Sequence, residues 1–204
     1  MIGKINSIET MGLVDGPGIR FVVFLQGCKL RCIFCHNPET WSNVPVIEIT
    51  PEELVDRVLR YKPYFDNNGG VTFSGGEPLL QPDFLIETCK LLKKYNINIA
   101  LDTSGVGIGK YEEVLKYVDL VILDIKAYEP ESYKKITGCD MKEYVKFLDT
   151  CTKLNKKLWL RQVIVPGIND NTEYIYRIAD RLRGHFPDAR IRVAHGQMDR
   201  EDIE

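Results

Sequence analysis

The chain has 204 residues, of which 44% are hydrophobic, a length and composition that suit one domain with a sizeable core. Its 27 basic and 29 acidic side chains nearly cancel, so charge gives no case for binding nucleic acid or an anionic membrane surface. No apolar run approaches the ~20 residues that a membrane-spanning helix needs.

Strand and helix patterns alternate along the chain. The N-terminal stretch MIGKINSIETMG lacks the apolar centre of a signal peptide, so we expect a cytoplasmic protein. Apolar runs then predict six strands, at residues 20–26, 71–74, 97–103, 119–125, 157–166 and 189–194. Helical spacing predicts five helices, at residues 50–62, 82–95, 110–118, 142–155 and 171–186. The first of these opens with a capping box, Thr50 to Glu53, and has Pro51 at its first helical position.

The alternation predicts the fold class. Connections long enough for parallel crossovers favour an α/β fold built from parallel strands. Eight strands would close a standard barrel, so six predict an open, partial (β/α)6 barrel. No linker or low-complexity segment divides the chain, and we expect residues 1–204 to form a single domain.

Polar and glycine residues gather where five of the predicted strands end. Sites in parallel α/β folds form at these carboxyl ends. The residues concerned are Gln26-Gly27-Cys28, Ser74 to Pro78, Asp102 to Gly105, Asp124-Ile125-Lys126, and Val165-Pro166-Gly167, with Arg161 on the fifth strand itself. Packing alone does not account for such a distribution, so we expect the functional site there.

The first strand leads into a loop with three closely spaced cysteines, Cys28, Cys32 and Cys35. In the reducing cytosol such a cluster indicates metal binding or catalysis more than disulfides. Three unrelated buried thiols are one reading, and a structural zinc site with His36 as fourth ligand is another. Adjacent Cys35 and His36 rarely point at one metal without strain, which disfavours zinc. The third reading is an iron–sulfur cluster with three thiolates and one iron open to a small molecule.

These motifs together resemble a known family. The spacing C-x3-C-x2-C after a first strand, followed by GGEP after a second, is similar to the radical S-adenosylmethionine superfamily. The stretch IETMGLVDGPGIRFVVFLQGCKLRCIFCHNPETW resembles the pyruvate formate-lyase activating enzymes, a family of glycyl-radical activases. LDTSG, VILDIKAY and LWLRQVIVPGIND fit the same family in the same order, so the resemblance covers roughly residues 3 to 180.

The resemblance implies a role for each matching residue. Cys28, Cys32 and Cys35 would ligate three irons of a [4Fe-4S] cluster, and S-adenosylmethionine would bind the fourth. The implied cofactor-binding residues are Phe34, Cys35, His36, Gly75, Gly76, Glu77, Asp102, Thr103, Asp124, Ile125, Lys126 and Arg161. Asp102 and Thr103, with the region of Ile122, resemble a monovalent-cation site, and Asp15 matches the acidic residue of VDGPG. Glycine lets backbone approach closely, so we expect a side chain at Gly76 to block the cofactor while the cluster still assembles.

Simpler explanations stay open for several residues. Asp102 could cap the following turn, and Lys126 or Arg161 could be structural ion-pair partners. The isolated cysteines Cys89, Cys139 and Cys151, the lone His185, and the tyrosines Tyr128 and Tyr133 are expected to have ordinary packing or surface roles.

The implied activity is the activation of a glycyl-radical enzyme, most simply pyruvate formate-lyase. One electron from the reduced cluster would cleave S-adenosylmethionine to methionine and a 5′-deoxyadenosyl radical, which would take a hydrogen atom from a backbone glycine of the partner. A flavodoxin-type reductant is implied, and we expect a monomer. Two rival readings remain: another radical S-adenosylmethionine enzyme, and a non-enzymatic zinc or electron-transfer module.

The C-terminal stretch departs from the family pattern. The resemblance fails over residues of about 185–204, HFPDARIRVAHGQMDREDIE, although ARIRVA still predicts a sixth strand. His195 would then fall near the place of the family's adenine-contacting histidine. We expect the cluster to form despite this departure, with weaker cofactor binding.

Overall fold

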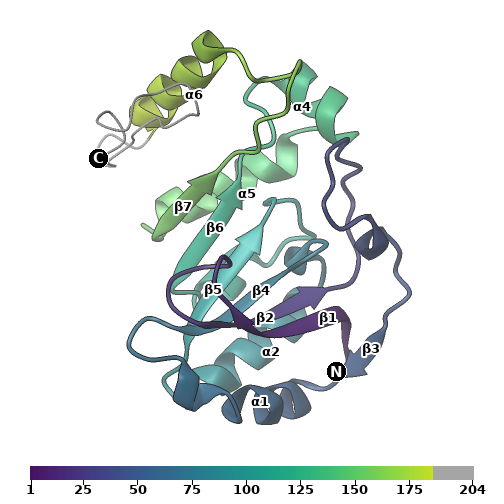
Figure 1. The fold of residues 1–204 in the computed structure, drawn as a ribbon, viewed down its shortest axis with the longest axis vertical. Helices are drawn as coiled ribbons and strands as arrows, with labels where there is room; N and C mark the ends of the chain where they lie inside the picture. The colour runs from purple at the N-terminus through teal and green to yellow at the C-terminus, as the bar shows by residue number, and fades with distance from the viewer. Residues whose placement is uncertain (186–204) are drawn as a thin grey trace. The chain divides into compact units, whose positions relative to one another are not determined.

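The structure is a computed structural model that describes residues 1–185 and forms two compact units, Met1–Gln162 and the part that follows from Val163. The first unit contains a seven-stranded sheet in the order β3-β1-β2-β4-β5-β6-β7 (Figure 1). The strands are β1 (Gly3–Gly12), β2 (Arg20–Leu25), β3 (Ile47–Ile49), β4 (Gly70–Gly75), β5 (Asn98–Thr103), β6 (Leu120–Asp124) and β7 (Leu158–Arg161).

Five of these strands run parallel and confirm the predicted fold class. From β2 through β4, β5 and β6 to β7, each neighbouring pair is parallel, and within the described residues the sheet does not close on itself. The strands β1 and β3, which were not predicted, pair antiparallel on the β2 side. The strand predicted at 157–166 ends at Arg161. The sixth predicted strand and His195 lie outside the described residues.

Helices connect the parallel strands in the first unit: α1 (Pro51–Leu59), α2 (Pro82–Lys93), α3 (Tyr111–Leu115), α4 (Pro130–Thr137) and α5 (Lys142–Lys153). The predicted capping box is present, because Glu53 N donates to Thr50 Oγ1 at 3.2 Å and Thr50 N donates to the Glu53 carboxylate at 2.9 Å. The helix α4 was not predicted. It begins with Pro130 and ends at Gly138, whose φ of +76° is the left-handed conformation of a helix C-cap.

The two faces of the sheet differ in what covers them. Alternate side chains of a strand point to opposite faces. One face carries Phe21, Val23, Val71, Phe73, Ile99, Leu101, Val121 and Leu123, which form the main core with side chains of the helices α1 to α5. On the opposite face, Ala100, Leu120 and Ile122 form a small separate cluster.

That second face becomes polar toward the carboxyl ends of the strands. The register pairs Phe24 with Ser74, Asp102 with Ile122, and Asp124 with Arg161. Asp102 and Asp124 come two positions after Ala100 and Ile122, so they lie on the same face as that cluster, and Arg161 pairs with Asp124 in the neighbouring strand. The sheet therefore presents charged groups at the end where parallel α/β folds place their sites.

The second unit is described as far as His185 and contains α6 (Thr172–His185). Its leading segment is folded around Asn169, whose side chain accepts a hydrogen bond from Val165 N at 2.6 Å and donates one to Val163 O at 2.9 Å. None of the helices in the described part of the chain is long and apolar enough to cross a membrane.

Candidate cofactor site at the carboxyl ends of the strands

The three cysteines lie on the loop that follows β2. Cys32 is buried, Cys28 and Cys35 are half-buried, and all three are free thiols. Cys35 N donates to Cys32 O at 3.0 Å, which makes a tight turn between these two. At the start of the loop, Gly27 N donates to Thr40 O at 2.8 Å and so closes the segment from 27 to 40 into a compact unit.

The cysteine loop is also fastened to α4. Arg31 N donates to Thr137 O at 2.7 Å, and Ile33 N donates to Ile136 O at 3.0 Å. The Arg31 guanidinium donates to Cys28 O at 2.8 Å and lies over the Trp41 ring at 5.0 Å from its centroid. The backbone on either side of Cys32 is thus held by a helix from a distant part of the sequence.

Two of the thiols, Cys28 and Cys32, are in an environment that opposes their ionisation. Burial raises the pKa of Cys28 to about 12, and the nearby Glu77, Cys32 and Cys35 add to this effect. Burial also raises the pKa of Cys32, against the opposing charge of Lys126. Metal binding to a thiol releases its proton, and a bound cationic group would thus offset the raised pKa values of Cys28 and Cys32.

The glycine pair at the end of β4 packs against β2 and the start of the cysteine loop. Gly75 has a φ of +110°, which favours glycine, and a Cβ there would lie 2.3 Å from Leu25 N. A Cβ on Gly76 would lie 2.3 Å from Gly27 O. Gly76 N donates to Leu25 O at 2.9 Å, and Glu77 N donates to Gly27 O at 2.8 Å. The glycines therefore permit close contact between two backbone segments of the protein itself.

Glu77 is buried, and both of its carboxylate oxygens have donors within the protein. One oxygen accepts from Leu79 N at 3.0 Å and from Thr103 Oγ1 at 2.6 Å. The other accepts from Ser104 N at 2.9 Å and from Ser104 Oγ at 2.5 Å. Burial nevertheless raises the pKa of Glu77, against the effect of these four bonds. Glu77 links the end of β4 to the end of β5, and its contact with an ammonium group stays a prediction.

A network of charges joins the ends of β5, β6 and β7. The Arg161 guanidinium bridges two carboxylates, with Nη2 at 2.7 Å from Asp102 Oδ1 and Nε at 2.7 Å from Asp124 Oδ1. Asp124 also pairs with Lys126 at 2.7 Å, and Asp102 accepts from Ser74 Oγ at 3.0 Å. Lys126 and Arg161 are therefore ion-pair partners, as the simpler explanation of these residues expected.

Burial and the opposite charges of the network act against each other on the pKa values of the carboxyl groups. Burial raises the pKa of Asp102, although Arg161 opposes the shift. Burial would also raise the pKa of Asp124, but Lys126 and Arg161 outweigh it and hold this pKa below its usual value. Asp15 is within the field of Arg161, and burial raises its pKa against that field. With Glu77, the carboxyl ends of the strands thus carry three carboxyl groups, Asp102, Asp124 and Glu77, beside the two cations Lys126 and Arg161.

Lys126 connects this network to the cysteine loop. Its Nζ lies 5.6 Å from the centroid of the Phe34 ring, and Phe34 is the residue before Cys35. Burial lowers the pKa of Lys126, but Asp124, with a smaller contribution from Cys32, outweighs burial and raises this pKa above its usual value. A cation close to the thiols stabilises their ionised form.

The remaining predicted residues have varied surroundings. Ile125 is buried and its N donates to Arg161 O at 2.7 Å, whereas His36 is exposed. Cys89 and Cys151 are buried in the core, and Cys139 is half-buried with its Sγ 3.5 Å from Lys29 O. The packing role expected for Cys89 and Cys151 fits these positions.

Three residues in this region have contacts that the sequence did not predict: Ser74, Ser104 and Tyr133, of which Tyr133 was expected only to pack. Ser74 and Ser104 belong to motifs noted in the sequence, and their partners Asp102 and Glu77 are far away in the chain. Tyr133 is on the unpredicted helix α4, so no pattern in the sequence pointed to it. Its hydroxyl is buried without a hydrogen-bond partner among the described residues.

The donor set suits an iron–sulfur cluster better than a single metal ion. Within residues 1–185, no three His, Cys, Asp or Glu side chains are placed to hold one metal ion. A cubane cluster takes each thiolate at a different iron, so its ligands need not converge on one point. Three free thiols on one loop, with the charge of Lys126 and the unpartnered Tyr133 hydroxyl beside them, fit such a group.

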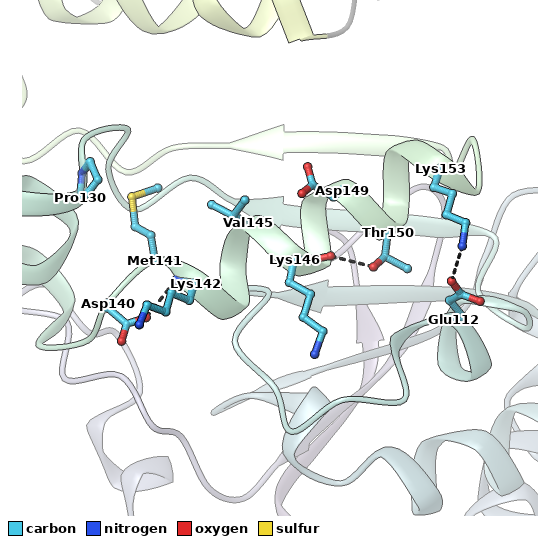
Figure 2. A pocket seen from close by; sticks show the side chains of 10 residues that line it. All are labelled: Glu112, Pro130, Asp140, Met141, Lys142, Val145, Lys146, Asp149, Thr150 and Lys153. Atoms are coloured by element: carbon cyan, nitrogen blue, oxygen red, sulfur yellow. Dashed lines mark hydrogen bonds and ion pairs between the residues drawn. The ribbon is translucent and has the colours of Figure 1, made fainter.

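A separate surface cavity of about 720 Å³ lies along α5 (Figure 2). Its lining residues are Glu112, Pro130, Asp140, Met141, Lys142, Val145, Lys146, Asp149, Thr150 and Lys153. Figure 2 shows Lys153 directed at Glu112, and the two form an ion pair of 2.8 Å. No residue of the cysteine loop lines this cavity, and we assign no role to it.

Sheet, cysteine loop and charge network together define an open α/β fold of the radical S-adenosylmethionine type. The model of the radical SAM superfamily matches residues 22–181. Among solved structures, methylornithine synthase is similar with a TM-score of 0.60 at 14% identity, over 85% of this chain and 52% of that one. A domain of the pyruvate-formate lyase-activating enzyme from Bacteroides vulgatus is similar with a TM-score of 0.50 at 27% identity, over 55% of this chain and 70% of that one.

Curated relatives narrow the class. The pyruvate formate-lyase-activating enzyme of Clostridium pasteurianum is 53% identical over 184 residues, which cover 90% of this chain and 77% of that protein. The enzyme of the same name from Staphylococcus epidermidis is 42% identical over 187 residues, covering 87% of this chain and 74% of that protein. The chain therefore belongs to the pyruvate formate-lyase-activating enzymes of the radical SAM superfamily.

Proposed function

We propose that this protein activates pyruvate formate-lyase by generating a radical on a backbone glycine of that enzyme. The observation that carries the proposal is the cysteine loop, whose backbone is bonded both to Glu77, directly after the glycine pair, and to α4 at the carboxyl ends of the strands. The relatives that share most of the chain bear the name of this activity. We also propose that both compact units belong to one radical SAM domain, since the family match at 22–181 crosses the boundary between them.

The family implies a [4Fe-4S] cluster and S-adenosylmethionine. Cys28, Cys32 and Cys35 would hold the cluster. When bound, these groups supply one-electron cleavage of a carbon–sulfur bond and the species that removes a hydrogen atom from glycine. The task of the protein is to orient these groups and to exclude water from them.

Several side chains are placed for that task. Lys126 presents a positive charge to the cysteine loop and is itself fixed by Asp124 at 2.7 Å. Arg161 fixes Asp102 and Asp124 relative to each other, so the ends of β5, β6 and β7 stay in register around the site. An ammonium and a sulfonium group, both cationic, would be attracted to an end of the sheet where carboxylates outnumber the basic groups.

The remaining parts of the proposal concern finer roles. We propose that Phe34, His36, Gly75, Gly76, Thr103 and Ile125 contact S-adenosylmethionine, and that Asp102 and Thr103 take a monovalent cation. We further propose a flavodoxin-type reductant, a monomeric enzyme and a cytoplasmic location. These follow from the resemblance of the motifs and from the reducing conditions that free thiols require.

The deciding experiment is anaerobic reconstitution followed by incubation with pyruvate formate-lyase, read by electron paramagnetic resonance. The wild-type protein should bind iron and sulfide and should produce a glycyl radical in the partner. Cys32→Ala should lose the bound iron and the radical, whereas the matched control Cys89→Ala should keep both. A Cys32→Ala protein with wild-type iron and wild-type radical yield would refute the ligand assignment. A wild-type protein that radicalises a different glycyl-radical enzyme instead would favour the rival activase reading.

A further inference from the structure

The hydroxyl of Tyr133 is a buried donor without an acceptor. Tyr133 is 0% exposed and packs in the main core, and its Oη has no hydrogen-bond partner among the described residues. Buried polar groups are hydrogen-bonded in the great majority of cases, and an unpaired one costs about 1–3 kcal/mol. Such a group in a native protein needs an explanation, and an acceptor outside the polypeptide is one explanation.

The position of α4 shows where that acceptor would lie. The last turn of α4 is bonded to the backbone on either side of Cys32, through Arg31 N to Thr137 O and Ile33 N to Ile136 O. Tyr133 is one turn before Thr137 and is held at its own N by Glu129 O at 2.8 Å. These bonds fix the Tyr133 ring at the same end of the molecule as the buried thiol of Cys32.

The electrostatic surroundings of the hydroxyl agree with this placement. Burial raises the pKa of Tyr133, and the next contributions come from Cys32, Tyr144 and Glu77. The hydroxyl therefore stays protonated and keeps its proton for donation. Glu77 already accepts four hydrogen bonds from other groups. The sulfur at Cys32 is therefore the neighbour that is left to accept a hydrogen bond from Tyr133.

We propose that Tyr133 is a positioning residue that donates a hydrogen bond to a sulfur at the Cys32 corner of the cluster. This inference rests on the proposed function, since it needs a cluster on the cysteine loop. A donor aimed at a cluster sulfur stabilises the reduced form, which carries one more negative charge, and so raises the reduction potential. Tyr133 would thus make the cluster easier to reduce.

The test is Tyr133→Phe, which removes the oxygen and keeps the ring. In the anaerobic, cluster-loaded protein without S-adenosylmethionine, the ratio of reduced to oxidised cluster at a fixed potential should fall about tenfold, equivalent to about 59 mV for one electron. Resonance Raman spectra should change in parallel. A shift in the terminal iron–thiolate modes identifies the Cys32 sulfur as acceptor, and a shift in the bridging modes identifies a sulfide.

The melting temperature of the cluster-free protein is the second measurement, and here the substitution should not be harmful. In the cluster-free protein the hydroxyl lacks a partner, so Tyr133→Phe should melt at the same temperature as the wild type or higher. A lower melting temperature would mean that the hydroxyl bonds to the protein itself, which would overturn the proposal. An unchanged potential with full iron content would overturn it as well.

Tyr144→Phe is the matched control. The two rings lie 5.8 Å apart, but the charges that raise the pKa of Tyr144 after burial are those of Tyr128, Asp124 and Cys151, none of them in the cysteine loop. The potential of this variant should equal that of the wild type. If the wild-type protein holds no cluster after reconstitution, the proposed function fails before this inference is reached, and iron and sulfide analysis separates the two outcomes.

Discussion

A methyl group added at Gly76 should disturb the cysteine loop and not only the cofactor. In Gly76→Ala the new Cβ would lie 2.3 Å from Gly27 O, 2.8 Å from Gly27 C and 3.1 Å from Thr40 Oγ1. Ordinary van der Waals contact of a Cβ begins at 3.4 Å, so one of the two backbones must move by roughly 1 Å. This differs from the expectation formed on the sequence alone, in which the cluster assembled normally after such a change.

The cost can be worked out from the bonds that hold Gly27. Its N donates to Thr40 O at 2.8 Å, and its O accepts from Glu77 N at 2.8 Å. A movement of that size breaks at least the bond to Glu77 N, which leaves a buried donor unpaired at about 1–3 kcal/mol. Overpacking adds about 1–3 kcal/mol. The sum is about 4 kcal/mol, which corresponds to a fall of about 8–16 °C in melting temperature for a chain of this length.

Thermal melting of the cluster-free protein and iron content after reconstitution test this reasoning together. Gly76→Ala should melt lower and bind less iron, because Gly27 is the residue before Cys28. The control is Gly109→Ala, whose φ of +101° strains an alanine but whose Cβ meets nothing within 4 Å, so only about 1–2 kcal/mol should be lost and iron binding should be normal. Normal melting and full iron content in Gly76→Ala, with only weaker S-adenosylmethionine binding, would show that the glycine serves the cofactor alone.

Three further variants test the charge network and the surface. Arg161→Met should lose about 2 kcal/mol in denaturant unfolding near neutral pH, a value reduced because Arg161 is 45% exposed. In this variant Asp102, whose pKa burial already raises, loses the cation that opposes the shift. A carboxyl group with a raised folded-state pKa costs stability when it ionises, so the loss of stability relative to the wild type should shrink as the pH falls toward about 5. A loss that grows at lower pH would contradict the assignment. Arg20→Lys should lose about 3 kcal/mol by the same measurement, because a lysine cannot replace the several donors of this fully buried guanidinium. These donors are directed at Thr72 Oγ1, Val71 O and Asn98 Oδ1. A loss under about 1 kcal/mol would be inconsistent with these hydrogen bonds. Lys153→Ala should leave the stability unchanged in the same measurement, since its pair with Glu112 is exposed, and a clear loss would mean that the cavity along α5 contributes to stability.

The sequence predicted the parallel part of the sheet because buried parallel strands are continuous apolar runs, as RFVVFL and LVILD are. It did not predict β1, where exposed and buried positions alternate and two bulges shift the register against β2. It also did not predict α4, although Pro130 at its start and Gly138 at its end are typical helix signals. The helix has eight residues, and only Tyr133, Ile136 and Thr137 are buried. The helical period of its apolar residues is therefore too weak to detect.

Spacing within the chain identified the candidate site, but not the contacts that build it. The three cysteines lie within eight positions, so one loop brings them together whatever the rest of the fold does. The partners of Glu77, by contrast, come from Thr103 and Ser104, 26 and 27 residues away. Which group donates to each carboxylate oxygen depends on the register between β4 and β5, and sequence motifs do not specify that register.

The helix α4 contributes to the surroundings of the cysteine loop, although no sequence motif indicates this. The helix α4 has no cysteine ligand and lies outside the quoted motifs, yet it forms two backbone bonds with the cysteine loop and carries a buried hydroxyl that has no partner among the described residues. Lys126, at the start of the connection between β6 and α5, presents its ammonium to Phe34 in the same loop. The segment from Lys126 to Thr137 therefore contacts the cysteine loop at both of its ends. Changes in this segment should affect the electronic properties of the bound group even though none of its residues is a ligand.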